Sequence, residues 1–233
     1  EMYALPARAF VEAHGGEVRV NAPARIELEQ GRLGSVRVRD DRFRAKAVVS
    51  AVAWHDIEGV LRGDTTAVQP ILDNAAGMAS SPIVTVNLWL DRAALDTPFI
   101  GLPGRAMQWV FDKRAVLGGE ASHLSLVSSG AAEILRLPND EIIALAEREV
   151  REALPGARGA RVVRATVVRE PRATFSLAPG QPARPAAATS VDGLWLAGDW
   201  TSTGLPATIE SAALSGHRAA QAAVAWLQGG HPR

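Results

Sequence analysis

The chain contains no cysteine, which excludes disulfide bonds, thiolate catalysis and zinc sites built on cysteine. It also has no net charge: 25 basic and 25 acidic side chains cancel, so nothing in the composition favours a nucleic-acid partner or a polybasic membrane anchor. The longest uncharged apolar stretch, residues 74–90, is interrupted by serine, proline, threonine and asparagine and is a poor membrane span. The lack of cysteine fits a reducing compartment, and we expect a cytoplasmic protein.

Several catalytic signatures are missing as well. No G-x-S-x-G, Walker A or H-E-x-x-H pattern occurs. The five histidines lie far apart and none has a partner four residues away, so we expect no metal site and interpret them as surface or turn residues: His14, His55, His123, His217 and His231. The acids of residues 139–154 are most simply solvated residues of one helix.

The beginning of the chain has neither a signal peptide nor an initiator methionine. Glu1 is acidic and no apolar h-region follows it. Phe10 and Val11 belong to a helix that is already under way. We therefore expect an internal start, with an N-terminal portion of the polypeptide absent.

Hydrophobic periodicity divides the chain into short strands and helices. We expect strands at 17–22, 24–31, 33–40, 42–52, 82–90, 105–113, 122–130, 160–170 and 194–198, and helices at 5–14, 55–61, 139–154 and 205–227. The order of these elements indicates an α/β protein in which a mixed-sheet block, residues 67–190, is inserted between residues 1–66 and 191–233 of a nucleotide-binding type of domain.

The last strand, turn and helix carry the sequence "LWLAGDWTSTGLPATIESAALSGHRAA", residues 194–220. Pro206 is expected in the first helical turn, where free N–H groups of residues 207–209 would favour an anionic or electron-rich group. Asp199 ends the strand at the same edge and could accept hydrogen bonds from sugar or polyol hydroxyls. The alternative is a capped, alanine-rich helix with Asp199 as a local turn former. The residues expected to pack are Ile209, Ala212, Ala213, Gly216, Ala220, Ala223, Val224 and Leu227.

The segment "LAGDWTSTGLPATIESAALSGHRAA" resembles the C-terminal flavin motif of the phytoene desaturase and flavin amine oxidase superfamily. Its "GDWTSTGLPATIES" form is most similar to the squalene-associated FAD-dependent desaturases, assigned as hydroxysqualene dehydroxylases. The stretches "FVEAHGGEVRVNAPARIE", "AVVSAVAW", "AMQWVFDK" and "PRATFSLAPGQPARPAAAT" are similar to other parts of the same family. The resemblance implies the later half of a Rossmann-like FAD-binding domain with an inserted mixed-sheet substrate domain.

The resemblance also implies which residues meet FAD. Gly198 and Asp199 would contact the ribityl–phosphate part, with Asp199 accepting a hydroxyl. The pyrimidine edge of the flavin would be lined by Pro206, Ala207, Thr208 and Ile209. Ala24, which we place at the turn of "NAPAR", would offer backbone hydrogen bonds to the adenine.

One departure from the family is large. The G-x-G-x-x-G turn that binds the pyrophosphate is absent from this sequence. FAD is held from both ends, so a chain without that turn would bind it weakly or not at all on its own. The resemblance therefore implies a partner segment, the missing N-terminal portion of the same enzyme.

The inserted block contains Trp109 and Phe111 on one expected strand, with Met107 expected on the same face. Aromatic residues at this spacing are typical of a core. In a family that handles polyprenyl chains they could instead wall an apolar tunnel. Trp200 follows Asp199 and could face the flavin or the substrate.

The resemblance implies reductive removal of the allylic hydroxyl of hydroxysqualene, giving squalene. The open alternatives are a carotenoid-type desaturase, a flavin amine oxidase, and a non-catalytic remnant or partner half. The substrate would be an apolar isoprenoid, and since such molecules dissolve in lipid, peripheral contact with the inner face of the membrane is expected.

Overall fold

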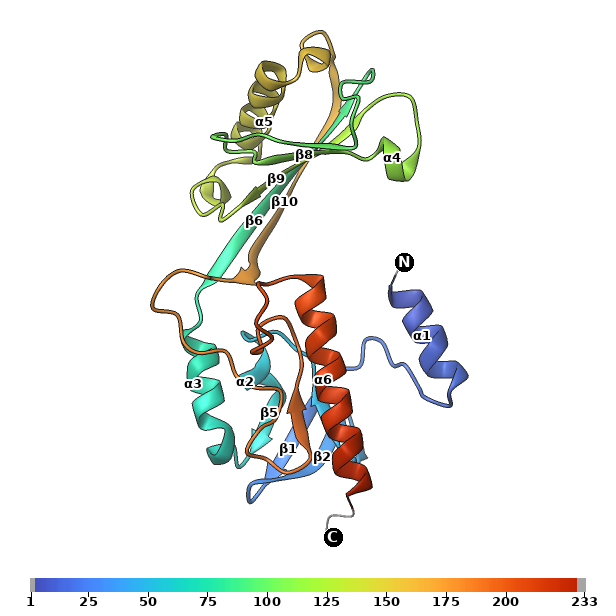
Figure 1. The fold of residues 1–233 in the computed structure, drawn as a ribbon, viewed down its shortest axis with the longest axis vertical. Helices are drawn as coiled ribbons and strands as arrows, with labels where there is room; N and C mark the ends of the chain where they lie inside the picture. Colours follow the sequence, from blue (N-terminus) through green and yellow to red (C-terminus); the bar gives the residue numbers. More distant parts are fainter. Residues whose placement is uncertain (1–2, 230–233) are drawn as a thin grey trace. The chain divides into compact units, whose positions relative to one another are not determined.

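The computed structural model describes residues 3–229, so His231 and Glu1 lie outside the described residues. The chain forms two compact units (Figure 1). Unit 1 combines residues 1–77 with residues 182–233, and unit 2 is residues 78–181. Unit 1 thus includes residues 67–77 and 182–190, which we had placed in the inserted block. The assignment of the units to FAD and substrate stays a prediction.

Unit 1 holds two small sheets. The first has the order β3-β2-β1-β5, in which β1 pairs antiparallel with β2 and parallel with β5. The second is the parallel pair β11 and β4. The bounds are α1 Ala4–Ala13, β1 Ala24–Glu29, β2 Arg32–Val38, β3 Asp41–Phe43, β4 Val48–Ser50, α2 Ile57–Val60, β5 Leu61–Gly63, α3 Gln69–Gly77, β11 Leu194–Leu196 and α6 Ile209–Gln228, with a 3₁₀ turn at Thr66–Val68.

The strands expected at 24–31 and 33–40 are present as β1 and β2, and the strand expected at 42–52 is divided into β3 and β4; β1, β2 and β3 form an antiparallel meander. Its first turn follows from Gln30 and Gly31, whose φ angles of 50° and 75° match the twist of a tight hairpin. The strand expected at 17–22 does not form. Asn21 there has a φ of 53°, which breaks an extended run.

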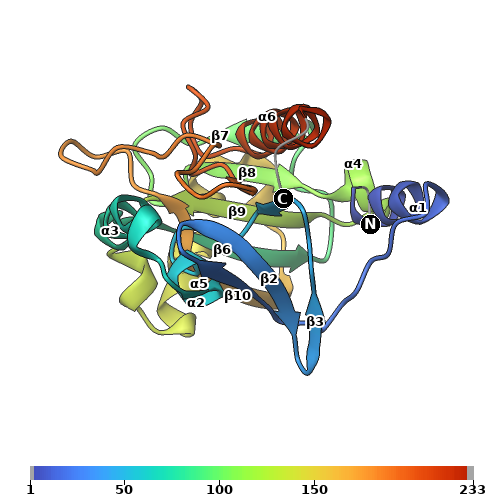
Figure 2. The same cartoon turned by 90° about the horizontal axis from the view of Figure 1, so that it is seen from below.

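Helix α6, seen end-on in Figure 2, begins four residues later than expected. Thr208 is its N-cap, in an extended conformation, and its Oγ1 accepts a hydrogen bond from the N–H of Ser211 at 3.1 Å. The position of Pro206 in the first helical turn was therefore wrong, because a threonine cap can open the helix only at the residue after it.

The packing face of α6 also differs from the expected one. The buried residues are spaced by four and include two serines: Ser211, Ser215, Ala219 and Ala223. Of the expected face only Ala223 is buried, whereas Ile209 is 72% exposed. The serine hydroxyls take part in hydrogen bonds within the unit, so polar residues occupy the inner face.

Unit 2 is a five-stranded sheet of order β10-β6-β9-β8-β7, with all neighbours antiparallel. Helix α5 contacts β6 and β10, and its residues Ile142, Ala146 and Val150 join the core of the unit. The four strands and the helix expected here are confirmed. The bounds are β6 Ser80–Leu90, β7 Phe99–Gly101, β8 Trp109–Asp112, α4 Arg114–Leu117, β9 His123–Ser129, α5 Asn139–Ala153 and β10 Val162–Phe175, with 3₁₀ turns at Ile134–Arg136 and Pro155–Ala157.

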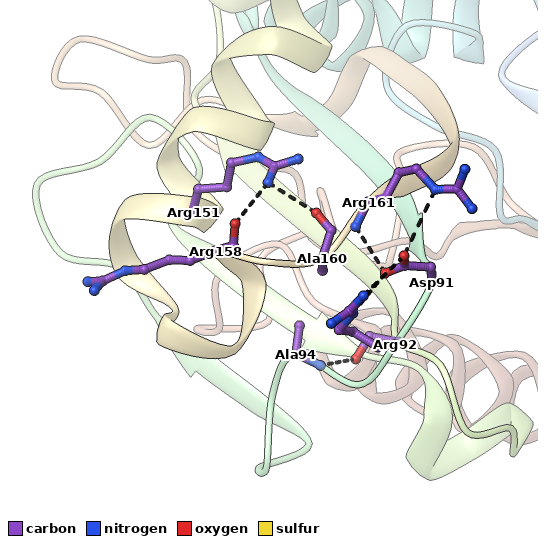
Figure 3. Close-up of polar contacts among 8 residues, drawn as sticks. Asp91, Arg92, Ala94, Arg151, Arg158, Ala160 and Arg161 are labelled. Carbon is purple, nitrogen blue, oxygen red and sulfur yellow. Dashed lines mark hydrogen bonds and ion pairs between the residues drawn. The ribbon is translucent and has the colours of Figure 1, made fainter.

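Polar contacts fix the loops at one end of this sheet (Figure 3). The Asp91 carboxylate accepts the backbone N–H of Arg161 at 2.9 Å and pairs with the guanidinium of Arg92. The Arg151 side chain donates to the carbonyls of Arg158 and Ala160. These contacts hold the connection from α5 into β10. No helix in residues 3–229 is long and apolar enough to span a membrane.

Candidate functional site

The turn after β11 is built around Gly198 and Trp200. Gly198 has a φ of 133°, and a Cβ atom on it would lie 2.7 Å from the indole of Trp200. Trp200 is fully buried and its Nε1 donates to the carbonyl of Val52 at 2.9 Å. We had expected Trp200 to face the flavin or the substrate. Its indole instead lies inside unit 1 with no exposed surface, where it supports the turn.

Hydroxyl groups close the turn onto the helix that follows. The backbone N–H of Gly198 donates to Oγ of Ser215 at 2.7 Å. The hydroxyls of Thr203 and Ser211 are buried and lie 2.6 Å apart. Thr201 donates its hydroxyl to the carbonyl of Gly198 at 2.9 Å. The many serines and threonines of this motif are therefore structural, which the sequence pattern did not show.

Arg184 is a residue that sequence reasoning missed. Its NH1 donates to the carbonyls of Asp199 at 3.2 Å and Leu205 at 2.8 Å, so it bridges both ends of the turn. It lies in the proline-rich loop, where Ala187 also accepts the N–H of Leu196. The only available signal was a single arginine in a segment without an apolar pattern.

The side chain of Asp199 is half-buried at the surface of this turn. Burial raises the pKa of its carboxyl above the ordinary value, against the lowering effect of backbone hydrogen bonds, chiefly from Trp200, and of Arg184. A carboxyl in this setting is well suited to accept a hydrogen bond from a ligand hydroxyl, because such a donor would relieve part of the cost of burial.

Residues 206–209 lie beside Asp199 at the N-terminus of α6. Pro206, Thr208 and Ile209 are exposed and Ala207 is half-buried. The first N–H groups of a helix have no partner within it, so those of Ile209 and Glu210 remain available to a ligand edge. The acidic side chain of Glu210 supplies negative charge in the same turn, which favours a neutral, hydrogen-bonding ligand edge over a strong anion.

Ala24 is also in unit 1, but as the first residue of β1 and not in the turn of "NAPAR". The positive φ of this segment belongs to Asn21. The carbonyl of Ala24 accepts NH1 of Arg25 at 3.0 Å, and the residue pairs with Val38. All residues expected to bind FAD therefore lie in one unit, whereas Trp109 and Phe111 lie in unit 2.

Trp109 and Phe111 are not core residues. Their exposed fractions are 44% and 39%, and with Phe99 they form an aromatic cluster whose ring centroids lie 6.0–6.3 Å apart. Met107 is fully buried, so it does not share their face as we had expected. Burial alternates along β8. Val110 and Asp112 point into the core, so Trp109 and Phe111, which alternate with them, point outward.

Glu149 was expected to be a solvated acid and is buried. Its carboxylate accepts the backbone N–H groups of Ala106 at 3.0 Å and Met107 at 2.8 Å. It therefore fixes the chain just before the aromatic strand. The reason lies in the helix register, since Glu149 is adjacent to Val150 on the buried side of α5.

Comparison with known proteins identifies the family. The family model for flavin containing amine oxidoreductases matches residues 2–224. The chain belongs to this family. Members of this family are FAD-dependent oxidoreductases.

Curated relatives point to two branches. A hydroxysqualene dehydroxylase of Sinorhizobium fredii is 36% identical over 61% of this chain and 32% of the relative. The 15-cis-phytoene desaturases of Synechococcus elongatus and Solanum lycopersicum are 26% and 30% identical over 97% and 96% of this chain. The chain spans 51% and 41% of those two desaturases, so it corresponds to about half or less of each relative.

Several solved structures share the fold. An oxidoreductase from Methanosarcina mazei has a TM-score of 0.69 at 16% identity, covering 90% of this chain and 51% of that one. Cyclohexylamine oxidase from Brevibacterium oxydans has a TM-score of 0.67 at 14% identity, covering 90% and 49%.

The residues of unit 1 fit one end of FAD. The half-buried Asp199 can accept a ribityl hydroxyl, and the open N-terminus of α6 can meet the polar edge of the ring system. The sequence has no G-x-G-x-x-G turn for the pyrophosphate. The chain thus carries the features expected of the ring end of the site and lacks those of the phosphate end.

Proposed function

We propose that this chain supplies the ring-binding end of the FAD site, together with the substrate face, of an oxidoreductase that acts on an apolar polyprenyl or triterpene substrate. The observation that carries the proposal is the exposed cluster of Phe99, Trp109 and Phe111, an aromatic surface on a unit that already has its own complete core. A surface of this kind suits a long apolar chain.

The reaction that we propose is the reductive dehydroxylation of hydroxysqualene to squalene. FAD supplies the hydride donor when it is bound and reduced. In the net reaction the allylic hydroxyl would be replaced by hydrogen: the C–O bond would break, the oxygen would leave as water with one proton, and the carbon would take the hydride that the reduced cofactor supplies. In this chain Asp199 and residues 206–209 would orient the cofactor. Trp109 and Phe111 would hold the hydrocarbon chain of the substrate.

The dehydroxylase branch is favoured by the higher identity, 36%, of its relatives in Sinorhizobium fredii and Rhodopseudomonas palustris. The phytoene desaturases favour the alternative, a carotenoid-type desaturase, because they match 96% or more of the chain. A flavin amine oxidase fits less well, since the sole tyrosine of the sequence, Tyr3, lies far from the flavin motif.

The proposal requires a partner segment that carries the pyrophosphate-binding turn. It also includes peripheral contact with a membrane, since the substrate is lipid-soluble. The non-catalytic alternative, a remnant that contributes surface only, differs in one property: it retains no FAD even when the partner segment is supplied.

The test is product analysis with this chain supplied together with the proposed partner segment that carries the pyrophosphate-binding turn. Incubation with hydroxysqualene and a reductant should yield squalene, whereas phytoene should be left unchanged. Desaturation of phytoene without any squalene would replace the dehydroxylase by the desaturase.

A further inference from the structure

One face of the unit 2 sheet carries a second group of side chains next to the aromatic cluster. Directly paired residues on neighbouring strands point to the same face. The pairs Trp89–His123 and Trp89–Arg164 therefore place three side chains from β6, β9 and β10 together. With two further residues they form what we call the donor cluster: Asn87, Trp89, Lys113, His123 and Arg164.

The members of the donor cluster are in direct contact. Lys113 Nζ and His123 Nε2 each lie 3.3 Å from Oδ1 of the buried Asn87. The His123 ring stacks on Trp89 with centroids 4.2 Å apart, and the guanidinium carbon of Arg164 lies 4.6 Å from the Trp89 ring centroid. His123, which we had expected at the surface or in a turn, is thus half-buried within a layered arrangement.

Within residues 3–229, neither cation of the donor cluster has an acidic partner. Among the described residues, no ion pair involves Lys113 or Arg164, whereas Arg105 pairs with Glu152 and Arg151 with Glu147. Asp112, the neighbour of Lys113, points into the core and accepts Ser122 Oγ at 2.6 Å and Arg114 Nε at 2.9 Å. The cluster therefore presents donors and positive charge without compensation.

The pKa of His123 agrees with this excess of positive charge. Its pKa is lowered, first by burial and then by the charge of Lys113, with a smaller lowering from Arg164, while Asp112 opposes them. Of these charged groups, Asp112 ends β8, Lys113 directly follows β8 and Arg164 lies on β10, while the neighbours of His123 on β6, Asn87 and Trp89, are neutral. An anion bound against Lys113 and Arg164 would offset their positive charge and raise the pKa of His123.

We propose that the donor cluster binds a phosphate group or another compact oxyanion, with Lys113 and Arg164 as the cationic contacts and His123 as a further donor. Charge-assisted hydrogen bonds of this kind are about twice as strong as neutral ones. Lys113 directly follows β8, the strand that carries Trp109 and Phe111, and Phe99 lies on the neighbouring β7. An oxyanion at the head of an apolar chain therefore fits this face. The chain-binding part rests on the proposed function, and the oxyanion contact does not.

The test is an NMR titration of the histidine rings in this 233-residue chain, with His123→Gln used to assign the signal. Adding inorganic phosphate should shift the His123 signal in a saturable way and raise the pKa of His123, because a bound anion favours the imidazolium. Octyl phosphate and neutral octanol are titrated in parallel. Tighter binding of octyl phosphate identifies the head of an apolar molecule, and equal binding identifies a free oxyanion.

Two matched variants complete the test. Lys113→Gln should weaken phosphate binding by about tenfold, the loss expected for one charge-assisted hydrogen bond, and should raise the pKa of His123 in the free protein. Lys46→Gln changes the only other lysine, which is exposed in unit 1, and should leave both quantities unchanged. Absence of any His123 response to both phosphates, or an equal response in Lys113→Gln and wild type, would overturn the proposal. FAD retention and squalene formation do not enter this measurement, so its failure leaves the proposed function standing.

Discussion

The Glu149 carboxylate of α5 accepts the backbone N–H of Met107 at 2.8 Å, two residues before Trp109. Through this contact and the one to Ala106, a buried acid on the covered side of the sheet fixes the start of the strand that bears the open aromatic face. The position of the aromatic cluster, which we propose binds the substrate, therefore depends on a buried residue that does not contact the substrate itself.

The first prediction concerns this contact. Glu149→Ala should lower the free energy of unfolding of unit 2 by about 1–3 kcal/mol, because two buried N–H groups lose their acceptor. Glu149→Gln should cost less, since its amide oxygen still accepts one of them. Glu152→Gln, one turn away on the surface, should leave the unfolding free energy nearly unchanged. Urea unfolding measures all three, and equal effects at both positions would contradict the assigned contact.

A second prediction tests the turn at Gly198. Gly198→Ala should destabilise unit 1 by roughly 2 kcal/mol or more, because the added Cβ meets the Trp200 indole and the backbone is left-handed. Gly204→Ala is the matched control, with a positive φ of 84° but open space around it, and should cost only about 1 kcal/mol. Thermal unfolding followed by tryptophan fluorescence reports both. A Gly198→Ala variant that unfolds at the same temperature as wild type would contradict the close contact between Gly198 and the Trp200 indole.

The third prediction is a pH dependence. The pKa of Asp199 is raised in the folded state, so the folded state binds more protons than the unfolded one just above the ordinary Asp value, and stability falls as pH rises through that window. Asp199→Asn should therefore be at least as stable as wild type at neutral pH. The difference should vanish at pH values below the ordinary Asp pKa of about 3.9. Unfolding curves at several pH values check this, and a loss of stability at neutral pH would contradict it.

A fourth prediction concerns Arg184. Arg184→Ala removes donors to the carbonyls of Asp199 and Leu205, so the turn should open more often while the rest of unit 1 stays folded. Hydrogen exchange at the amides of Thr201 and Thr203 should become faster, with exchange in the β1–β2 pair unchanged. Faster exchange throughout unit 1 would point to global destabilisation instead.

The sequence was sufficient for most of the longer elements, but not for the short elements α3, β7 and α4 or for the orientation of several faces. Alternation and capping patterns located the strands of unit 2 and the helix at 139–154, because both are local properties. At α6 two local signals competed, Pro206 and Thr208, and the threonine cap determined the first helical residue. Its inner face could not be predicted, since burial of Ser211 depends on a hydroxyl of Thr203 that lies outside the helix.

The same limit applies to the candidate sites. Which side of the Trp109 strand faces the core is decided by α5, a distant element that covers only one face of the sheet. The role of Arg184 depends on a loop that folds back along the turn. Long-range contacts of this kind leave no period in the sequence, so they become visible only in the structure.

The central claim is that the turn beside Asp199 and the opening residues of α6 hold the ring end of FAD. The most direct measurement is the flavin absorbance of this chain, purified together with the proposed pyrophosphate-binding partner segment, for wild type, Asp199→Ala and the exposed control Asp192→Ala. We predict that wild type and Asp192→Ala retain FAD. Asp199→Ala should bind FAD at least about tenfold more weakly, because it loses one hydrogen bond to a charged acceptor. A wild-type chain that never retains FAD when the partner segment is supplied, or an Asp199→Ala variant that retains FAD as well as the control, would contradict the account.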